Sequence, residues 1–304
     1  MIRDTNLKIK KSIIYTIFSL FSFFPLQNGF LAKETLFIGA IPDQQPEKLN
    51  RLYRLLSDEL SQNLNVRVIY KPVTNYSATV TAFRTRDLDL VWFGGLTGVQ
   101  ARLQRKGAKV LAQRDIDVKF HSVFIAHHKS QLPLIQKVSD LKLLKGKRFT
   151  FGSESSTSGR LMPQYFLTKA GIELKDFKGG RPGFSGSHDA TLALVQSGSY
   201  EAGVLNEQVW LLNKQRGRVD LSKVNLIWRT PPYVDYHWLA QPDLDERFGK
   251  GFTKKLQAVI LGLNSNDPTE AKILNLFGSK KFIEANPNDY KNIERIGRKI
   301  GKIK

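Results

Sequence analysis

The sequence contains no cysteine. Without this residue the chain can form no disulfide, no thiolate metal site and no cysteine nucleophile, and it can carry no lipid on an N-terminal cysteine. After residue 32 there is also no run of 18 uninterrupted apolar residues, so the sequence predicts no membrane-spanning helix in that part. The 41% hydrophobic residues in a chain of 304 support a well-buried core, more naturally in two domains than in one.

Several motifs of enzymes and nucleic-acid binders are missing as well. There is no G-x-x-x-x-G-K-[ST] phosphate loop and no H-E-x-x-H metal site, and His127 and His128 have no partner at ligand spacing. No helix-turn-helix, zinc-finger or RNP signature is present. The sequence therefore predicts neither a cofactor nor a metal, and it makes nucleic acid a minor hypothesis.

The N-terminus has the pattern of an export signal. A basic segment precedes the apolar stretch Ser12–Leu26, and its positive residues are Arg3, Lys8, Lys10 and Lys11. We predict a signal peptide over residues 1–32, cleaved near Ala32, and a periplasmic mature chain. Phe30 stands where a small residue is usual before the cleavage site, so an uncleaved membrane anchor is the alternative.

The formal net charge is +20, of which +17 falls on residues 33–304. Such a charge suits nucleic acid, an anionic membrane surface or the steering of small anions, and a general bias towards lysine explains it equally well. The basic residues are scattered and do not alternate with aromatic residues in one stripe.

The first part of the chain alternates strands with helices, which indicates a parallel α/β sheet. Leu49, Leu52, Leu56 and Leu60 recur at helical spacing. The predicted strands are Thr35–Pro42, Val66–Val73 and Leu88–Phe93, and the predicted helices are Pro46–Leu64, Tyr76–Arg86 and Leu96–Gly107.

The pattern restarts after a predicted strand at Phe120–His128, which is also the first predicted crossing, and this restart predicts a second α/β unit. Its predicted strands are Arg148–Gly152, Tyr200–Leu205 and Val224–Trp228, and its predicted helices are Val138–Lys147, Arg160–Gly171 and Ala190–Gly198. The proline-bearing stretch Arg229–Ala240 suits a crossing between two units. We expect residues 243–304 to form helices that return to the first unit.

The segment Gly152–Arg160 places four serines and a threonine between a predicted strand and a predicted helix. In open α/β sheets, ligands bind beyond the carboxyl ends of strands, where helix N-termini offer free backbone N–H groups. The hydroxyls of Ser155–Ser158 add donors there, which suits a tetrahedral oxyanion. A single hydroxyl would be explained as a helix cap, but four in a row exceed what a cap requires.

Two other strand ends have the same chemistry. Gly94 and Gly95 end one strand and open a helix at Thr97, and Ser187 and His188 open another helix. Tyr76 follows a third strand and can donate its phenolic hydroxyl, although a buried core tyrosine fits the pattern equally well.

These motifs in this order resemble the phosphate, phosphite and phosphonate-binding proteins of ABC importers, including a branch labelled as selenate-binding. The resemblance runs from about Thr35 to the C-terminus, on the segments 40–43, 72–76, 89–95, 140–159 and 230–238. It implies a two-lobed periplasmic binding protein fold of type II, with each lobe a mostly parallel sheet flanked by helices. It also implies two hinge crossings and closure on one anion.

The resemblance also implies ligand-binding residues. The donor triplet of the family corresponds to Ser156, Thr157 and Ser158, its cleft tyrosine to Tyr76 and its helix-start histidine to His188. Phe93 stands where phosphonate binders commonly have tyrosine, and Asn206 stands first where an acidic group would hold a ligand amine. A phosphorus oxyanion without an amine, such as phosphite, phosphate or methylphosphonate, is therefore predicted.

From the resemblance we expect lobe 1 over residues 33–124 and 236–304 and lobe 2 over residues 125–235. The expected partners are the small oxyanion and a membrane permease, with no nucleic acid, and the expected state is a monomer. The alternatives are a receptor for selenate or another oxyanion, and a secreted serine hydrolase built on Ser156, His188 and Asp189. No G-x-S-x-G elbow surrounds the serines, so we expect binding without catalysis.

Overall fold

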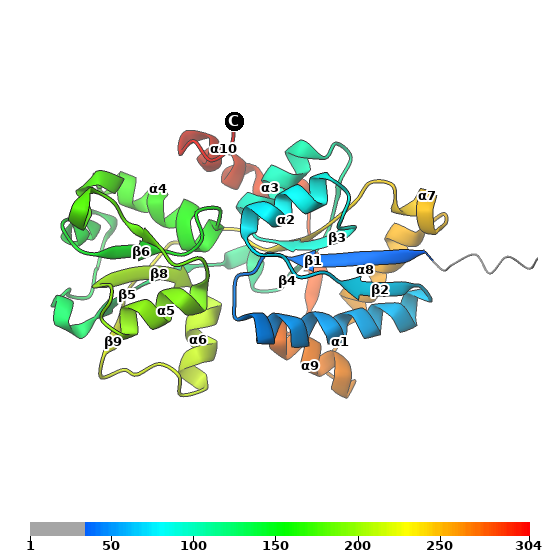
Figure 1. Cartoon of the computed structure of the whole chain (residues 1–304), viewed down its shortest axis with the longest axis horizontal. Helices are drawn as coiled ribbons and strands as arrows, with labels where there is room; N and C mark the ends of the chain where they lie inside the picture. The colour runs from blue at the N-terminus through cyan, green and yellow to red at the C-terminus, as the bar shows by residue number, and fades with distance from the viewer. Residues whose placement is uncertain (1–33) are drawn as a thin grey trace, which may run out of the picture. The chain divides into compact units, whose positions relative to one another are not determined.

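The computed structural model describes residues 34–304, so the predicted signal peptide lies outside the described residues. These residues form two β-sheets with helices on their faces (Figure 1). Within this part of the chain no helix is long and apolar enough to cross a bilayer.

The first sheet has six strands in the order β11-β4-β10-β3-β1-β2. The strands are β1 Thr35–Ala40, β2 Arg67–Tyr70, β3 Leu90–Phe93, β4 Lys109–Arg114, β10 His237–Ala240 and β11 Phe282–Glu284. β3 is buried along its whole length because helices cover both faces of this sheet.

The helices of this unit are α1 Pro46–Leu64, α2 Tyr76–Arg84, α3 Gly95–Gln104, α7 Leu244–Phe248, α8 Phe252–Gly262, α9 Pro268–Phe277 and α10 Lys291–Lys299. Adjacent strand residues point to opposite faces. Phe93 therefore meets Phe83 of α2 on one face, while Trp92 meets Phe277 of α9 on the other. In Figure 1, α2 and α3 lie on one side of the sheet and α1 and α9 on the other.

The second sheet has five strands in the order β7-β6-β8-β5-β9. The strands are β5 Ser122–His127, β6 Phe149–Phe151, β7 Gly183–Phe184, β8 Ala202–Asn206 and β9 Val224–Arg229. Its helices are α4 Met162–Lys169, α5 His188–Gln196 and α6 Glu207–Gln215. Short 3₁₀ turns and one π-helical turn, at Thr157–Leu161, complete this unit.

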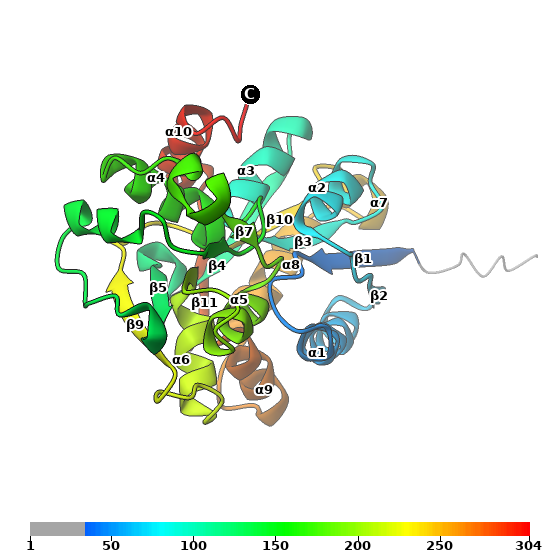
Figure 2. The ribbon, with the colours of Figure 1, turned by 60° about the vertical axis from the view of Figure 1, so that its left-hand side comes forward.

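Two chain segments connect the sheets and lie side by side. Phe120 and Tyr233 exchange backbone hydrogen bonds of 2.8 and 3.0 Å as an antiparallel bridge, and Asp235 N–H donates to the Asp117 carbonyl at 3.1 Å. Figure 2 shows the second unit brought towards the viewer, with α5 and α6 beside the first. The predicted crossings were Phe120–His128 and Arg229–Ala240, but β5 and β10 occupy much of these ranges, and the paired segments lie just before the two strands.

The α/β fold with two sheets is confirmed, and both sheets are mixed. β1 pairs in parallel with β2 and β3, whereas β10 pairs antiparallel with β3 and β4. In the second sheet β5 is antiparallel to both of its neighbours. β5 and β10 directly follow the connecting segments, so each strand enters its sheet from the side that faces the other sheet. Each therefore runs opposite to the strands that β-α-β crossovers connect.

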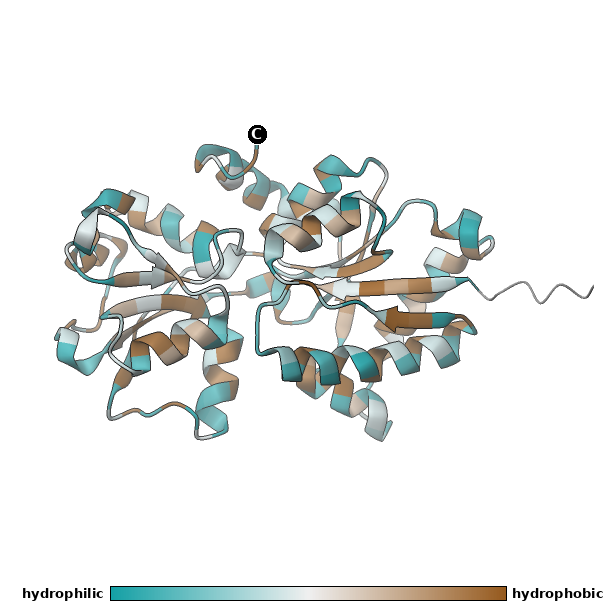
Figure 3. Cartoon of the chain, in the orientation of Figure 1, coloured by the Kyte–Doolittle hydropathy of each residue, from teal (hydrophilic) through white to brown (hydrophobic). Residues whose placement is uncertain are grey.

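The sequence missed three strands of the first sheet, of which β10 lies in the stretch that was predicted as a crossing. β4 has no prediction, and the expectation that residues 243–304 are all helical is wrong at β11, which pairs with β4. The predicted helix at Val138–Lys147 is a 3₁₀ helix over Val138–Leu144. Hydrophobic residues concentrate on the strands and on the sheet-facing sides of the helices (Figure 3). A strand as short as β11 becomes buried only through the elements packed around it.

Candidate anion-binding site

Loops from the two sheets meet directly. Leu96 N–H, in the first turn of α3, donates to the Thr157 hydroxyl at 2.9 Å. His188 N–H, at the start of α5, donates to the Asp43 carbonyl at 3.0 Å. Because each bond joins a loop of one sheet to a loop of the other, the polar groups at these strand ends enclose one common region.

The serine-rich loop reaches this region through a tight backbone turn. Ser156 caps the π-helical turn, and its hydroxyl accepts from Gly159 N–H at 2.9 Å. A Cβ at Gly159 would approach the Ser156 hydroxyl to 3.0 Å and the backbone of Gly152 to 3.2 Å, so a side chain here would press on the turn. Pro163 lies in the first turn of α4, as the sequence predicts.

Two hydroxyls near this loop have no partner among residues 34–304. The Ser158 hydroxyl and the Tyr76 hydroxyl are both buried and have no partner with hydrogen-bond geometry in this part of the chain, although Ser156 lies close enough to lower the pKa of Tyr76 and Ser158 close enough to lower that of Tyr233. Burial raises the pKa of Tyr76 well above its usual value, and the negative charges of Asp43 and Asp235 raise it further. Both hydroxyls are therefore neutral donors that still lack an acceptor.

His188 is fully buried in a chain of hydrogen bonds. Its Nδ1 accepts from Asn206 N–H at 3.3 Å, and its Nε2 lies 3.3 Å from the Tyr236 hydroxyl. The Asn206 side-chain amide donates to that same hydroxyl at 3.0 Å, while its oxygen caps α6 through Val209 N–H. Burial lowers the pKa of His188 to about 3, so the ring is neutral and carries its proton on Nε2.

Two buried carboxyl groups complete the region. Asp235 Oδ1 accepts from Gly95 N–H at 2.8 Å, whereas Oδ2 has no partner among the described residues. Burial raises the pKa of Asp235 to about 7, and the charge of Asp117 adds to this rise. Burial likewise raises the pKa of Asp43 to about 6, against the effect of the nearby Tyr236 hydroxyl. Both groups are thus poised to exchange a proton near neutral pH.

A buried arginine lies behind Tyr236. The Arg114 guanidinium is 4.8 Å from the centre of the Tyr236 ring and pairs with Asp117 through bonds of 2.7 and 2.8 Å. Its third contact goes to the Phe277 carbonyl at 2.7 Å. The Tyr236 ring also stacks near Trp92, with ring centres 5.7 Å apart, and the same guanidinium lies 5.4 Å from the centre of the Trp92 ring. Tyr236 is therefore held in one orientation.

The structure places Phe93 in the core, where its ring contacts Phe83 edge-on at 5.8 Å, and it supplies no hydroxyl to the region. Asp189 likewise lies apart from the His188 ring. Its oxygens accept from Gln45 N–H and from the Asn213 amide, each at 3.0 Å. Ser156, His188 and Asp189 therefore form no catalytic relay in this arrangement.

Sequence reasoning did not assign Asp43, Asp235 and Tyr236 to the site, although it quoted the segments that contain them. The available signals were a proline–aspartate pair directly after a buried strand, and an aspartate–tyrosine pair at the end of a crossing. Among residues 34–304 there is no cluster of three His, Asp or Glu side chains that could hold a metal.

Comparison with known proteins defines the family. Residues 38–290 match the family described as ABC transporter, phosphonate, periplasmic substrate-binding protein. The chain belongs to this family. A relative described as a probable ABC transporter phosphite-binding protein of Prochlorococcus marinus is 53% identical over 302 residues, which cover 98% of this chain and 99% of the relative.

Solved structures agree with this assignment. A binding protein of Prochlorococcus marinus in complex with methylphosphonate is 57% identical, with a TM-score of 0.86, and the match covers 88% of this chain and 99% of that one. A phosphonate-transporter binding protein of Pseudomonas aeruginosa is 20% identical, with a TM-score of 0.73 over 87% and 85% of the two chains, and shows the shared fold.

As a member of this family of substrate-binding proteins, the chain is a non-enzymatic component of an ABC importer. It acts in the periplasm, and its partners are a small ligand and a membrane permease. The hydrolase alternative is therefore set aside on the family as well as on the contacts of Asp189.

Proposed function

We propose that this binding protein captures a small phosphorus oxyanion, with phosphite and methylphosphonate as its preferred ligands. Three buried polar atoms that have no hydrogen-bond partner in the described part of the chain carry the proposal: Tyr76 Oη, Ser158 Oγ and Asp235 Oδ2. Two of them donate and one accepts, which suits an anion that keeps a proton on one oxygen. The relative described as phosphite-binding and the methylphosphonate complex support this ligand class.

The remaining polar groups would complete the anion site. Ser156 and Thr157 belong to the same turn as Ser158, and His188 packs beside this turn in hydrogen bonds with Asn206 and Tyr236. Phe93 stays a predicted apolar neighbour of the ligand. Phosphate, selenate and other oxyanions remain competing ligands that a thermal-shift screen against purified protein can rank.

An ionised Asp235 would also distinguish ligands by their protonation. A carboxylate accepts a hydrogen bond from an oxyanion that bears an O–H group and repels one that has lost this proton. Neutral His188 and the hydroxyls add donors without a formal charge.

We further propose that residues 1–32 direct export, that the mature chain is a monomer and that it binds no nucleic acid. The basic n-region, the apolar stretch Ser12–Leu26 and the absence of a nucleic-acid motif support these points. Mass spectrometry of the periplasmic protein gives the cleavage site, and sedimentation gives the oligomeric state.

The predicted lobes, residues 33–124 with 236–304 and residues 125–235, are proposed to close on the ligand, with the first boundary moved to residue 121 because β5, Ser122–His127, belongs to the second sheet. Contacts such as that of Thr157 with Leu96 N–H exist only when the loops of both sheets are together. A ligand that contacts both sets favours closure. Small-angle scattering should show a smaller radius of gyration when methylphosphonate is added. An unchanged radius at saturation would contradict the closing mechanism.

Replacing Ser158 with alanine should separate ligand binding from folding. The hydroxyl has no hydrogen-bond partner among residues 34–304, so we expect Ser158→Ala to leave the free energy of unfolding unchanged or slightly increased. Loss of a buried bond to the anion should weaken methylphosphonate binding about 10- to 100-fold. Calorimetric titration and urea unfolding measure the two effects.

Thr157→Val is the contrasting variant. It removes the acceptor of Leu96 N–H as well as a donor to the anion, so both affinity and stability should fall, each by about 1–3 kcal/mol. If Ser158→Ala binds methylphosphonate as the wild type does, the assignment of Ser158 is wrong.

A further inference from the structure

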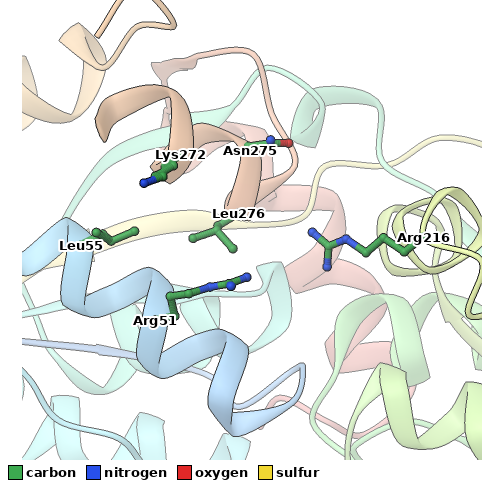
Figure 4. A pocket seen from close by; sticks show the side chains of 6 residues that line it. All are labelled: Arg51, Leu55, Arg216, Lys272, Asn275 and Leu276. Atoms are coloured by element: carbon green, nitrogen blue, oxygen red, sulfur yellow. The ribbon is translucent and has the colours of Figure 1, made fainter. Parts of the chain in front are cut away.

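A second concave region lies away from the anion site, between helices α1, α9 and α6 (Figure 4). Its cavity volume is about 420 Å³. It is lined by Arg51, Leu55, Arg216, Lys272, Asn275 and Leu276. Arg216 immediately follows α6 of the second unit, whereas the other five residues belong to α1 and α9 of the first.

The lining combines three cations with no carboxylate. Arg51 and Arg216 extend their guanidinium groups towards one another in Figure 4, and neither they nor Lys272 form an ion pair with any residue of Glu34–Lys304. Two like charges that face each other without a counter-charge repel. The pocket therefore presents an uncompensated positive potential.

The positive field extends to the neighbouring turn of α1. Burial lowers the pKa of Lys48 to about 8, and the charge of Arg216 also lowers it, against the nearby acids Asp43 and Asp189. Both oxygens of Asp189 already accept hydrogen bonds, from Gln45 N–H and from Asn213. The acids near Lys48 thus do not pair with Arg216.

We propose that this pocket is a second anion site, which binds a small multivalent anion of the phosphate class between Arg216 on one side and Arg51 and Lys272 on the other. Guanidinium groups bind phosphate oxygens in a two-pronged geometry, and the Asn275 amide offers a further polar group. The concave shape favours a compact ligand over a flat protein surface.

Occupation of the pocket would connect the two units. An anion that contacts Arg216 together with Arg51 stabilises the arrangement in which α6 lies against α1 and α9. Close packing of Gln208 of α6 on Gly278, at the end of α9, already marks this contact. By linkage, an anion that favours this arrangement strengthens binding of the first ligand, and the first ligand strengthens binding of the anion.

Pyrophosphate is the probe for this site. Its binding to the mature protein is measured by calorimetry at constant ionic strength, with the anion site saturated by methylphosphonate. We expect Arg216→Gln and Arg51→Gln each to weaken pyrophosphate binding about tenfold or more, as loss of a charge-assisted contact requires. Arg218→Gln removes the same charge two residues away, outside the pocket lining. This variant should change the affinity for pyrophosphate less than about twofold.

A second measurement tests the connection between the units. Pyrophosphate should strengthen methylphosphonate binding to the wild type and to Arg218→Gln, but not to Arg216→Gln. If pyrophosphate instead competed for the first site, it would weaken methylphosphonate binding. Equal pyrophosphate binding by all variants, or no binding by the wild type, overturns the proposal. Because pyrophosphate is also titrated alone, failure of methylphosphonate to bind would count against the proposed function and not against the second site.

Discussion

Asp235→Asn should stabilise the protein at pH 8 by up to about 4 kcal/mol and leave its stability at pH 4 nearly unchanged. Burial raises the pKa of Asp235 from 3.8 to about 7, so the folded chain keeps a proton that the unfolded chain releases between these values. Stability from this group is therefore full below pH 4 and is lost as the pH rises to about 7, at about 1.4 kcal/mol for each pKa unit. Asparagine stays neutral and keeps an oxygen for Gly95 N–H.

Urea unfolding of ligand-free protein from pH 4 to pH 8 measures this difference. Asp58→Asn is the matched control, because Asp58 is exposed on α1 and should show no comparable change. The pKa of Asp43 is raised to about 6, so the stability of the Asp235→Asn variant should still fall with rising pH, but by a smaller amount. If wild type and Asp235→Asn lose stability in parallel as the pH rises, Asp235 is not the group responsible.

The same variant should lose selectivity for protonated ligands. Asparagine presents an amide donor or a neutral oxygen where the carboxylate accepts from an O–H group, so an oxyanion without that proton is no longer repelled. The ratio of affinities for phosphite at low and high pH should therefore become flatter than in the wild type. An unchanged profile would remove Asp235 from the set of ligand contacts.

Arg114→Met should destabilise the protein by about 3–5 kcal/mol, because it leaves a buried carboxylate without its cation. Asp117 is fully buried and receives two side-chain bonds from Arg114, and the Phe277 carbonyl would lose its donor too. The double variant Arg114→Met with Asp117→Asn should recover part of the loss, since asparagine carries no charge. Denaturant unfolding at pH 7 measures all three proteins.

A surface pair serves as the control for Arg114. Arg298 is about half exposed and pairs with Glu294 one helical turn away, so Arg298→Met should cost less than about 1 kcal/mol. If the Arg114 variant is no less stable than the Arg298 variant, the buried pair does not stabilise the region behind Tyr236.

Local pattern alone predicted much of the first unit. The leucine spacing and Pro46 set the limits of α1 as the structure has them, since burial of one helical stripe and a proline in the first turn are local properties. The segment around Ser156 was likewise predicted to precede a helix with Pro163 near its start. A helix with one buried face can be predicted from sequence because apolar residues recur at every third or fourth position.

The short strands were not predicted because they form only through pairing with residues far away in the sequence. β11 has three residues and pairs only with β4, more than 160 positions earlier in the chain. β10 was predicted as part of a crossing, yet it lies between β3 and β4 in the first sheet. Such strands gain their hydrogen bonds and burial from residues that no local window contains.

The sequence by itself determined the family resemblance and the hydroxyl-rich turn, and with them the prediction of an oxyanion ligand, because these depend on residue type and on order along the chain. Only the tertiary structure showed that Ser158, Tyr76 and Asp235 each keep a buried polar atom with no hydrogen-bond partner within residues 34–304. Whether a polar group is satisfied, and how far its pKa moves, depends on neighbours that folding brings from elsewhere in the chain. Likewise, only the tertiary structure showed that Arg51, Arg216 and Lys272 line one pocket. Charges far apart in sequence repel one another only when the fold brings them together.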